Sequence, residues 1–499
     1  MKKTLLLFCL GLSMQSLTAS ASYSFDKSVN HVSAVADGTQ WTDFAASSFE
    51  GGEGTAESPY LIKTPEQLAK LAKDVYDGTS VYENTYFKLV ADIDLAGHDW
   101  FPIGYNCSVG EENVRVAFSG KVDGDGHKIT NLTIPGLTDY KSMGMFGCTD
   151  PGFELRNLTI ESGSITGDMV VGPFVGSNSG IIENCVNKVD ISCVYYYAGG
   201  IVGSNYREGV IRQCVNYGDI TAGSEGGNGM SAGGVAGTCY SLIEECANFG
   251  DVKAMTNGAG GVIGLLEGGV IRNCINTGKV SGPERLGGII GDALGRGDNC
   301  ELYNCYNVGA IDGNSTLGGI IGLAMFQNFN TLKMHDMYFS SDVFAGSSCG
   351  EVTDIFGAFE ITNAPVMTSE QMKAEDFVTT LNNGSGSEDK IWAADTKNIN
   401  NGFPILSFME SIGTGIASPA FNDNINVYAA DNRIVVEGAD GEMMQVYTVG
   451  GQMVYSGKAS DISSEPGLFI VRINNNSYKV AQLQISVAYF CSIGLYFLV

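Results

Sequence analysis

Cysteine recurs in this chain at a nearly constant interval, and a thiol can form a disulfide, bind a metal or act as a nucleophile. Copies of one short pattern, such as "IIENCVNKVDI" (181–191) and "VIRNCINTGKV" (270–280), carry one cysteine each, with steps of 29, 32, 28 and 31 residues. The five cysteines of this row are Cys185, Cys214, Cys246, Cys274 and Cys305. Zinc sites take thiols in clustered pairs or beside histidine, so one cysteine per copy does not favour zinc.

Leucine occupies the cysteine position in two earlier copies of the pattern. These copies are "ITNLTI" (129–134) and "LRNLTI" (155–160), with Leu132 and Leu158 at the shared position. A position that accepts leucine or cysteine is apolar and inward-facing, where an unpaired cysteine behaves as a small hydrophobic side chain. We therefore predict a structural ladder of buried thiols. Disulfides between neighbouring copies are the alternative that the spacing leaves open.

Other residues with catalytic or metal-binding chemistry do not form a recognisable set. His31, His98, His127 and His335 lie in unrelated segments, and neither H-E-x-x-H nor G-x-S-x-G occurs. In "VDGDGH" (122–127), two aspartates two residues apart resemble the start of a calcium loop, but the later acidic ligands are missing, so we predict a structural turn. We predict no catalytic residue, no metal site and no cofactor.

Aromatic residues are the candidates for ligand binding. The position after the second asparagine of each copy is Lys188, Tyr217, Phe249, Thr277 or Val308. Further tyrosines lie nearby, at Tyr195, Tyr196, Tyr197, Tyr206 and Tyr240. Exposed aromatic faces suit sugar rings, so Tyr217, Phe249, Tyr195, Tyr196 and Tyr197 form a candidate glycan platform. Aromatic side chains that pack on one another along a stack are the structural alternative.

The repeated unit predicts the architecture that would position these residues. Each copy of about 30 residues holds short β-prone runs separated by Gly, Asn, Asp and Ser, and a second element such as "GGIVG" (199–203) recurs between the copies. Strands this short are stable only when the units stack, which predicts a right-handed parallel β-helix over residues 120–345. Two apolar rows, beginning at Ile182 and Ile191, are expected to point inward, and the paired glycines to form tight corners.

Charged residues two positions before the thiol row alternate in sign. They are Arg156, Glu183, Arg212, Glu244 and Arg272. Neighbours in a parallel stack lie about 4.8 Å apart, so alternating charges at exposed positions would attract one another weakly and help to fix the register. This interpretation removes the two glutamates from the list of catalytic candidates.

A polysaccharide lyase or a glycoside hydrolase is the enzymatic alternative, because such enzymes occur on parallel β-helices. They need carboxylates or basic residues gathered from adjacent coils. The outward positions of successive copies here mix Glu, Arg, Tyr, Thr and Val without such a cluster. We therefore favour a non-catalytic binding protein.

Composition limits the partners. The formal net charge is −27, which disfavours phosphate backbones and anionic lipid surfaces, so we expect no nucleic-acid partner. The chain has 67 glycines, only 11 prolines and 17% charged residues, which is typical of an ordered, glycine-punctuated fold.

Segments at both ends of the predicted β-helix are expected to form helices that cover its open ends. "TPEQLAKLAKDVYDG" (64–78) and "TSEQMKAEDFVTTLNNG" (368–384) each begin with a helix capping box. Before them, residues 1–21 have the basic, apolar and small-residue order of a cleavable signal peptide, so we expect an exported protein at the outer surface or outside the cell.

Residues 409–480 differ in pattern from the repeats. They alternate apolar and polar residues between turn signals, which predicts a small antiparallel β-sandwich. The uncharged tail "AQLQISVAYFCSIGLYFLV" (481–499) has two interpretations, a shifted reading frame or a membrane anchor.

Residues 51–408 contain "SPYLIKTPEQLAKLA", "FSGKVDGDGHKITNL", the repeated GG-h-h-G (h, hydrophobic) and N-C-x-N motifs, and the closing "NINNGFPIL". Through these motifs they resemble the GLUG-repeat β-helix surface proteins of Bacteroidetes. This resemblance implies an adhesive surface protein, with glycans or host extracellular matrix as partners, and brings no catalytic residues. Residues 409–480 resemble the sorting domain of the type IX secretion system through "VYTVGG" (446–451) and "PGLFIV" (466–471), which implies contact with the secretion machinery.

These observations predict an order of domains but no oligomeric state. The predicted order is signal peptide 1–21, N-terminal extension 22–50, N-terminal cap and first coils 51–140, repeats 141–345, C-terminal cap 346–408, sandwich 409–480 and tail 481–499.

Overall fold

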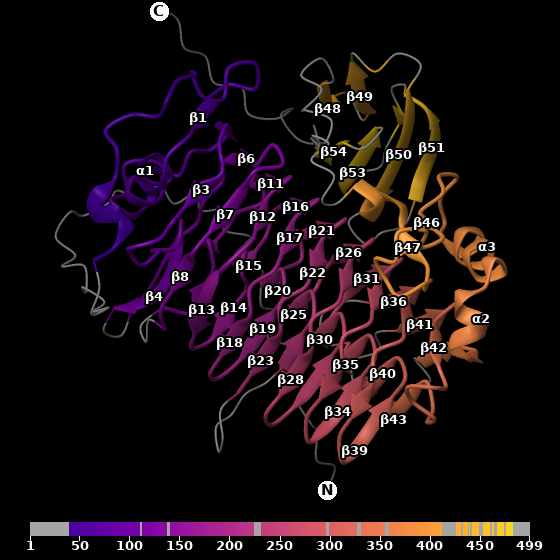
Figure 1. Ribbon diagram of the computed structural model, residues 1–499. Coiled ribbons are helices and arrows are strands. Elements are labelled where there is room, and N and C mark those ends of the chain that lie inside the picture. Colours follow the sequence, from indigo (N-terminus) through magenta and orange to yellow (C-terminus); the bar gives the residue numbers. More distant parts are fainter. Residues whose placement is uncertain are drawn as a thin grey trace, which may run out of the picture. The chain divides into compact units, whose positions relative to one another are not determined.

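The computed structural model describes residues 39–482, apart from 110–111, 137–139, 224–230, 296–298, 327–330, 355–358, 412–425 and several short turns beyond 430. The predicted signal peptide, most of the N-terminal extension and nearly all of the tail lie outside the described residues. The described chain is mainly a parallel β-helix in which each repeat contributes one strand to each of five sheets (Figure 1). The expected fold class, an all-β parallel solenoid with few helices and small antiparallel sheets at the C-terminal end, is confirmed.

The strands directly before and after each cysteine of the thiol row belong to the first and second sheets. The first sheet consists of β1 (Tyr60–Ile62), β2 (Tyr86–Leu89), β6 (Lys121–Asp123), β11 (Glu154–Arg156), β16 (Ile181–Glu183), β21 (Val210–Arg212), β26 (Leu242–Glu244), β31 (Gly269–Arg272), β36 (Cys300–Tyr303), β41 (Leu332–His335) and β44 (Phe359–Ile361). The second sheet consists of β3 (Ile93–Asp94), β7 (Lys128–Thr130), β12 (Thr159–Ile160), β17 (Val186–Asn187), β22 (Val215–Asn216), β27 (Ala247–Asn248), β32 (Ile275–Asn276), β37 (Tyr306–Asn307), β42 (Tyr338–Ser340) and β45 (Val366–Met367).

The remaining three sheets complete each coil. The third sheet consists of β8 (Leu132–Ile134), β13 (Gly163–Gly167), β18 (Ile191–Cys193), β23 (Ile220–Ala222), β28 (Val252–Ala254), β33 (Val280–Ser281) and β38 (Ile311–Asp312). The fourth consists of β9 (Ser142–Met143), β14 (Val170–Val171), β19 (Tyr197–Gly199), β24 (Ser231–Gly233), β29 (Gly258–Gly260), β34 (Glu284–Gly287) and β39 (Ser315–Gly318). The fifth consists of β10 (Phe146–Cys148), β15 (Val175–Asn178), β20 (Val202–Asn205), β25 (Ala236–Cys239), β30 (Ile263–Leu266), β35 (Ile290–Ala293), β40 (Ile321–Phe326) and β43 (Cys349–Asp354).

The register between coils aligns equivalent residues of the repeat. Ile182 pairs with Ile211, which pairs with Ile243, and these side chains are buried in the core. The paired glycines lie where the fourth sheet turns into the fifth. A Cβ added to Gly200 would lie 2.1 Å from the carbonyl oxygen of Gly234 in the next coil, so the corner can be this tight only with glycine.

The N-terminal helix covers the first coils. Thr64 and Gln67 form the expected capping box of α1 (Pro65–Tyr76), and Leu68, Leu71 and Val75 belong to the same core cluster as the first coils. A short 3₁₀ helix, η1 (Trp41–Phe44), and a hairpin of β4 (Tyr105–Val109) and β5 (Glu112–Val116) accompany this end of the solenoid.

The segment after the last coil packs along a flank of the solenoid. It contains α2 (Ser369–Lys373), α3 (Glu375–Gly384), β46 (Trp392–Ala393), β47 (Ile405–Leu406) and η2 (Ser407–Ser411). Phe377, Trp392 and Met409 share one buried cluster with outward residues of the second sheet, including Tyr306 and Val215. This segment therefore covers the outer face of several coils (Figure 1).

The C-terminal sheets have a small core of their own. One sheet contains β48 (Asn426–Ala430), β49 (Arg433–Glu437) and β52 (Ile462–Ser463), and the other contains β51 (Met453–Lys458), β50 (Met443–Thr448), β53 (Gly467–Ile473) and β54 (Asn476–Gln482). All their described pairings are antiparallel, and Ile434, Val446 and Val471 are buried between them.

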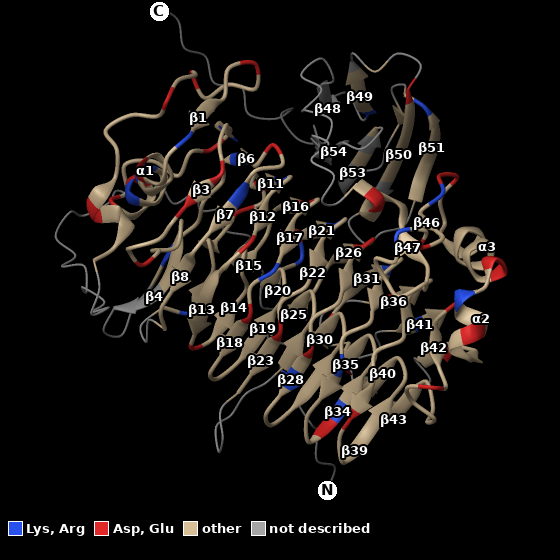
Figure 2. Ribbon diagram, in the orientation of Figure 1, with Lys and Arg blue, Asp and Glu red and all other residues tan. Residues whose placement is uncertain are grey.

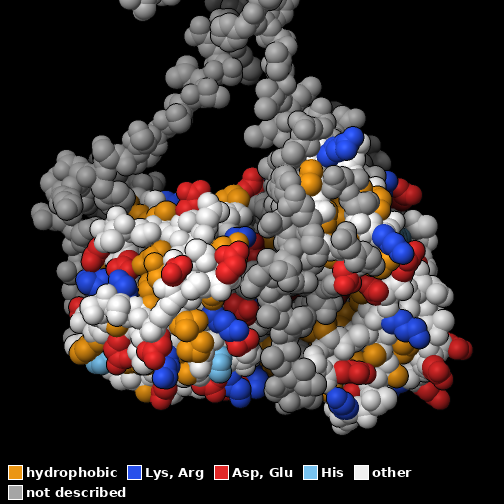
Figure 3. Space-filling model, turned by 90° about the horizontal axis from the view of Figure 1, so that it is seen from above, with side chains coloured by type: hydrophobic (Ala, Val, Ile, Leu, Met, Phe, Trp, Pro, Cys, Tyr) orange, Lys and Arg blue, Asp and Glu red, His pale blue; other side chains and the backbone are white. Residues whose placement is uncertain are grey.

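Charged residues are sparse along the coils (Figure 2), and the face seen from above carries side chains of both signs (Figure 3). The alternating charges of the first sheet differ from the expectation of exposure, because all five are buried. Beside them runs a buried apolar row, Ile181, Val210, Leu242 and Val270, against which Met453 of β51 packs. The repeat pattern does not predict this packing of a C-terminal strand on the outer face of the first sheet. We call the five buried alternating charges the charge ladder of the first sheet.

Candidate functional site

The thiol row lies inside the β-helix, where no substrate reaches it. Cys185, Cys214, Cys246, Cys274 and Cys305 are free and fully buried. Each Sγ donates a hydrogen bond to the carbonyl oxygen two residues earlier, over 3.2 to 3.3 Å. Burial raises the pKa of Cys185 and Cys246 well above that of an ordinary thiol. The described residues hold no group of His, Cys, Asp and Glu that could bind a metal ion.

Asparagines on both sides of the cysteine have separate structural roles. The residue before the cysteine is in the left-handed region, with φ near +50°, which asparagine tolerates better than most residues. The second asparagine forms a fully buried ladder. Asn216 Nδ2 donates to Asn248 Oδ1 at 2.8 Å, and Asn248 Nδ2 donates to Asn276 Oδ1 at 2.8 Å. Sequence reasoning missed this ladder, although the repeated N-C-x-N is its signal.

The described histidines make different local contacts. His98 stacks on Phe44 with 4.0 Å between ring centroids, His127 Nδ1 lies 3.0 Å from Asp92, and His335 stacks on Tyr303. His31 lies outside the described residues. The aspartates of "VDGDGH" form a turn, because the backbone N–H of Asp125 donates to the carboxylate of Asp123.

The five residues of the predicted glycan platform occupy two different corners. Tyr217 and Phe249 follow strands of the second sheet, and their rings stack 4.9 Å apart at an interplanar angle of 14°. Tyr195, Tyr196 and Tyr197 lie where the third sheet turns into the fourth, at the opposite end of the third-sheet strands. The structure therefore does not bring these five side chains together.

A second stack of tyrosines lies at the corner between the fifth and first sheets. Tyr206 follows β20 and Tyr240 follows β25, and their rings are nearly parallel, with centroids 5.9 Å apart and an interplanar angle of 10°. Tyr206 is 45% exposed. We call Tyr206 and Tyr240 the tyrosine column.

Neighbouring groups gather around Tyr240. Burial, together with the charge of Glu267 and the phenols of Tyr197 and Tyr206, raises the pKa of Tyr240 to about 12. Glu267 follows β30, one coil beyond, and is itself buried. Gly237, three residues before Tyr240, leaves room for Tyr197, since a Cβ there would lie 2.9 Å from the Tyr197 Cβ. The column thus combines an exposed aromatic face with hydroxyl and carboxylate groups.

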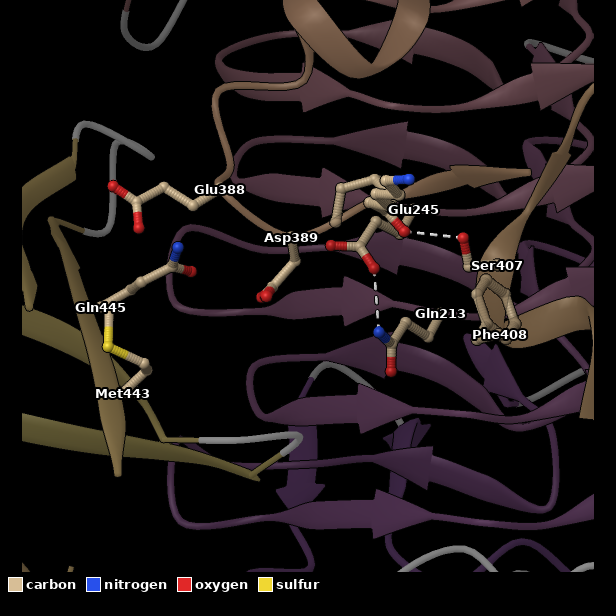
Figure 4. Close-up of a pocket in the computed structure, with 10 residues that line it drawn as sticks. Gln213, Glu245, Glu388, Asp389, Ser407, Phe408, Met443 and Gln445 are labelled. Carbon is tan, nitrogen blue, oxygen red and sulfur yellow. Dashed lines mark hydrogen bonds between the residues drawn. The ribbon is translucent and has the colours of Figure 1, made fainter. Parts of the chain in front are cut away.

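A pocket of 610 Å³ lies beside the first sheet (Figure 4). In two coils at this pocket, the left-handed residue before the cysteine is Gln213 or Glu245 instead of asparagine. Gln213 Nε2 donates a hydrogen bond to Glu245 Oε2 at 2.8 Å. Glu388 and Asp389 of the flanking segment also line the pocket. The carboxylates make it unsuited to anions.

No family model matches the chain. A stretch of 148 residues is 35% identical to a protein of Evansella cellulosilytica named "Putative Gly-rich membrane protein", covering 28% of this chain and 15% of the relative. A stretch of 171 residues is 32% identical to Halomucin of Haloquadratum walsbyi, covering 32% of this chain and 2% of Halomucin. The chain thus spans only a small part of the length of these relatives.

A solved structure, described as a "putative immunoglobulin A1 protease" from Bacteroides ovatus, is similar over 72% of this chain and 95% of that chain, with 21% sequence identity and a TM-score of 0.43. Among the described residues of the present chain, no helix has the length and apolar character needed to cross a bilayer.

Proposed function

We propose that this chain is a cell-surface protein whose β-helix binds carbohydrate at the tyrosine column without turning it over. The observation that carries the proposal is the parallel stack of Tyr206 on Tyr240 at an exposed corner. An aromatic ring offers an apolar face to the C–H groups of a sugar ring, while its hydroxyl and nearby polar groups form hydrogen bonds. The names of the two curated relatives, a membrane protein and Halomucin, support a location in the cell envelope.

The C-terminal sheets take the role of a sorting domain in this proposal. Their antiparallel strands and separate small core are what the resemblance to the type IX sorting domain requires. In this scheme residues 426–482 contact the secretion machinery, and the β-helix, which resembles the GLUG-repeat proteins, forms the adhesive part.

A glycan and host-matrix array on the mature protein tests the binding proposal. We expect carbohydrate spots to bind, and Tyr206→Ala and Tyr240→Ala each to weaken binding at least tenfold, which corresponds to about 1.4 kcal/mol. Tyr217→Ala is the matched control, because Tyr217 stacks on Phe249 at a different corner. A silent array, or equal loss in all three variants, would contradict the assignment.

A polysaccharide degradation assay distinguishes binding from catalysis. We expect no release of new chain ends from any polysaccharide that binds on the array. Release with turnover would show that the chain is a polysaccharide-degrading enzyme, and the non-catalytic part of the proposal would be wrong.

A further inference from the structure

The corner that carries the tyrosine column is built from turns of unequal length. Residues 149–153 connect β10 to β11, residues 206–209 connect β20 to β21, and only residues 179–180 connect β15 to β16 in the coil between them. A two-residue turn therefore lies between two longer turns.

Ser179 takes the column position directly next to Tyr206. Asn178 pairs with Asn205 in the parallel register, and the backbone N–H of Tyr206 donates to the Asn178 carbonyl oxygen at 2.9 Å. Tyr206 therefore has Tyr240 on one face, and the residue aligned on its other side is the small Ser179. Because Tyr206 is 45% exposed and Ser179 is small, a ligand ring has room against this second face.

An ion pair lies on the other side of the short turn. The backbone N–H of Ser179 donates to Thr149 Oγ1 at 3.1 Å, which places the turn 149–153 beside it. Arg115 Nη1 donates to Asp150 Oδ1 at 2.9 Å, and Arg115 Nη2 donates to the Thr149 carbonyl oxygen at 3.0 Å. Both charged side chains are nearly half exposed, at 46% and 43%, so they keep hydrogen-bonding capacity toward solvent.

The spacing between these two walls fits one ring. Asp150 and Tyr206 lie two coils apart, which is about 9 to 10 Å along the solenoid axis. A six-membered sugar ring in contact with the Tyr206 face leaves its other side within hydrogen-bonding reach of the Asp150 carboxylate and the Arg115 guanidinium. Such planar charged groups pair well with adjacent hydroxyls.

The charges around the column discriminate among sugars. Asp150, Glu208 of the 206–209 turn and Glu267 beyond Tyr240 are acidic, while Arg115 and Arg207 are the basic side chains of the two long turns and their neighbouring hairpin. The excess of carboxylate, in a protein of net charge −27, repels an anionic ligand. Neutral hydroxyl groups meet no such repulsion.

We propose that a neutral pyranose ring binds at Ser179 as an additional member of the tyrosine column, between the open face of Tyr206 and the Arg115–Asp150 pair. This inference rests on the proposed function and specifies its ligand and its exact subsite. The glycan chain then crosses the corner at right angles to the solenoid axis, because the ring is parallel to the Tyr206 and Tyr240 rings.

Calorimetric titration of the mature protein tests the subsite. The probes are neutral gluco-, manno-, galacto- and xylo-oligosaccharides, and oligogalacturonate as the anionic counterpart. Ser179→Tyr fills the subsite with a third stacked ring and leaves Tyr206 in place, so we expect at least tenfold weaker binding of the neutral probe. Ser179→Ala is the matched control and should bind within twofold of the wild type.

Two further measurements keep the test decisive if Ser179→Tyr does not fold. Asp150→Asn should weaken the neutral probe severalfold and reduce the preference over oligogalacturonate. Hydrogen exchange should show protection of residues 178–181 and 206–209 when the neutral sugar binds, and none at Tyr217.

The outcomes separate the subsite from the function. Neutral binding that Tyr206→Ala abolishes, but that Ser179→Tyr and Asp150→Asn leave unchanged, would overturn the subsite while the proposed function stands. Tighter binding of oligogalacturonate would overturn the ligand class. Failure of every probe to bind would contradict the proposed function itself.

Discussion

Arg212 and Glu183 lie at the same position of adjacent coils and form a buried ion pair, with 2.7 Å between Nη2 and Oε1. The arginine side chain is 1% exposed and that of the glutamate 7%. Two coils further on, Arg272 and Glu244 repeat the arrangement at 2.6 Å. Buried charges of this kind are strongly sensitive to the loss of one partner, because the remaining charge stays out of water.

Replacing Arg212 by leucine should therefore destabilise the protein by about 3–5 kcal/mol, since the buried Glu183 loses its ion-pair partner. The double variant Glu183→Leu with Arg212→Leu should recover most of this loss. Chemical unfolding measures both effects. Lys279→Ala is the control, because its exposed pair with Asp312 should not affect the unfolding midpoint. Equal unfolding midpoints for Arg212→Leu and Lys279→Ala would show that the charge ladder of the first sheet is solvated.

The buried asparagine ladder predicts a second large effect. Asn248→Ala removes the acceptor of Asn216 and the donor to Asn276 and Gly250, all fully buried. Each unsatisfied group costs about 1–3 kcal/mol, so we expect a total loss of at least about 3 kcal/mol. Thermal unfolding against Thr277→Ala, a half-buried neighbour, measures it. A loss below about 1 kcal/mol would mean that water enters the asparagine ladder and replaces the lost hydrogen bonds.

The repeat predicted the solenoid because its signal is periodic. Ile182, Ile211 and Ile243 recur at one position, and in a parallel stack equal positions must align. The burial of Arg212 was not predictable in this way, because the outer face of the first sheet packs against a later, unrelated segment. Met453 of that segment packs on the apolar row that begins at Ile181 and includes Val210, beside Arg212. Long-range packing of this kind leaves no periodic trace in the sequence.

The division of the aromatic residues had a similar cause. Tyr197 and Tyr217 are close in sequence, but a third-sheet strand separates their corners. Conversely, Tyr206 and Tyr240 are 34 residues apart and stack, because each directly follows a strand of the fifth sheet and the last residues of these strands, Asn205 and Cys239, pair in register. The ends of the strands therefore decide these relations, and sequence patterns locate the ends of short strands poorly.

The thiol ladder predicts selective chemical labelling. Under native conditions a small alkylating reagent should modify Cys349, which is partly exposed, well before Cys185, Cys214 or Cys246. Mass spectrometry of peptides after timed labelling measures the order, and labelling in denaturant is the control that shows all thiols are free. Rapid native labelling of Cys246 would place it outside the core.

The substitution Cys246→Ser should lower the free energy of unfolding less than the burial of a hydroxyl group usually does. An unsatisfied hydroxyl would destabilise by about 1–3 kcal/mol, but Cys246 Sγ already donates to the Glu244 carbonyl oxygen at 3.2 Å, and a serine can keep this bond. We therefore expect chemical unfolding to show a loss of about 1 kcal/mol in the free energy of unfolding. An unchanged midpoint would contradict burial of this side chain.

Acid should weaken the first-sheet ladder through Glu154. Burial alone would raise its pKa, but Lys121 at 2.5 Å and Arg156 at 2.7 Å hold the pKa below the ordinary 4.5. The carboxylate therefore stabilises the fold at pH above 4.5, and this contribution is lost as the pH falls from there through the lowered pKa. Urea unfolding between about pH 7 and pH 3 should show a steeper decline for the wild type than for Glu154→Gln. Parallel curves would contradict the assignment.

Removal of the C-terminal sheets should separate export from folding, provided that the cut falls after η2. Met409 is 1% exposed and packs with Trp392 and Leu406, so a deletion of 409–499 would damage the flanking segment, whereas a deletion of 412–499 leaves it whole. We expect the 412–499 deletion to retain the cooperative unfolding of the β-helix but to remain inside the cell envelope, because the proposed sorting signal is gone.

Deletion of 403–499, which also removes Ile405, Leu406 and Met409, is the comparison and should lower the unfolding midpoint. Surface labelling of intact cells and thermal unfolding of the purified proteins measure the two properties. Display of the 412–499 deletion on the cell surface would show that the sorting role is wrong, and loss of its unfolding transition would show that the C-terminal sheets are needed to stabilise the buried ladder of the first sheet.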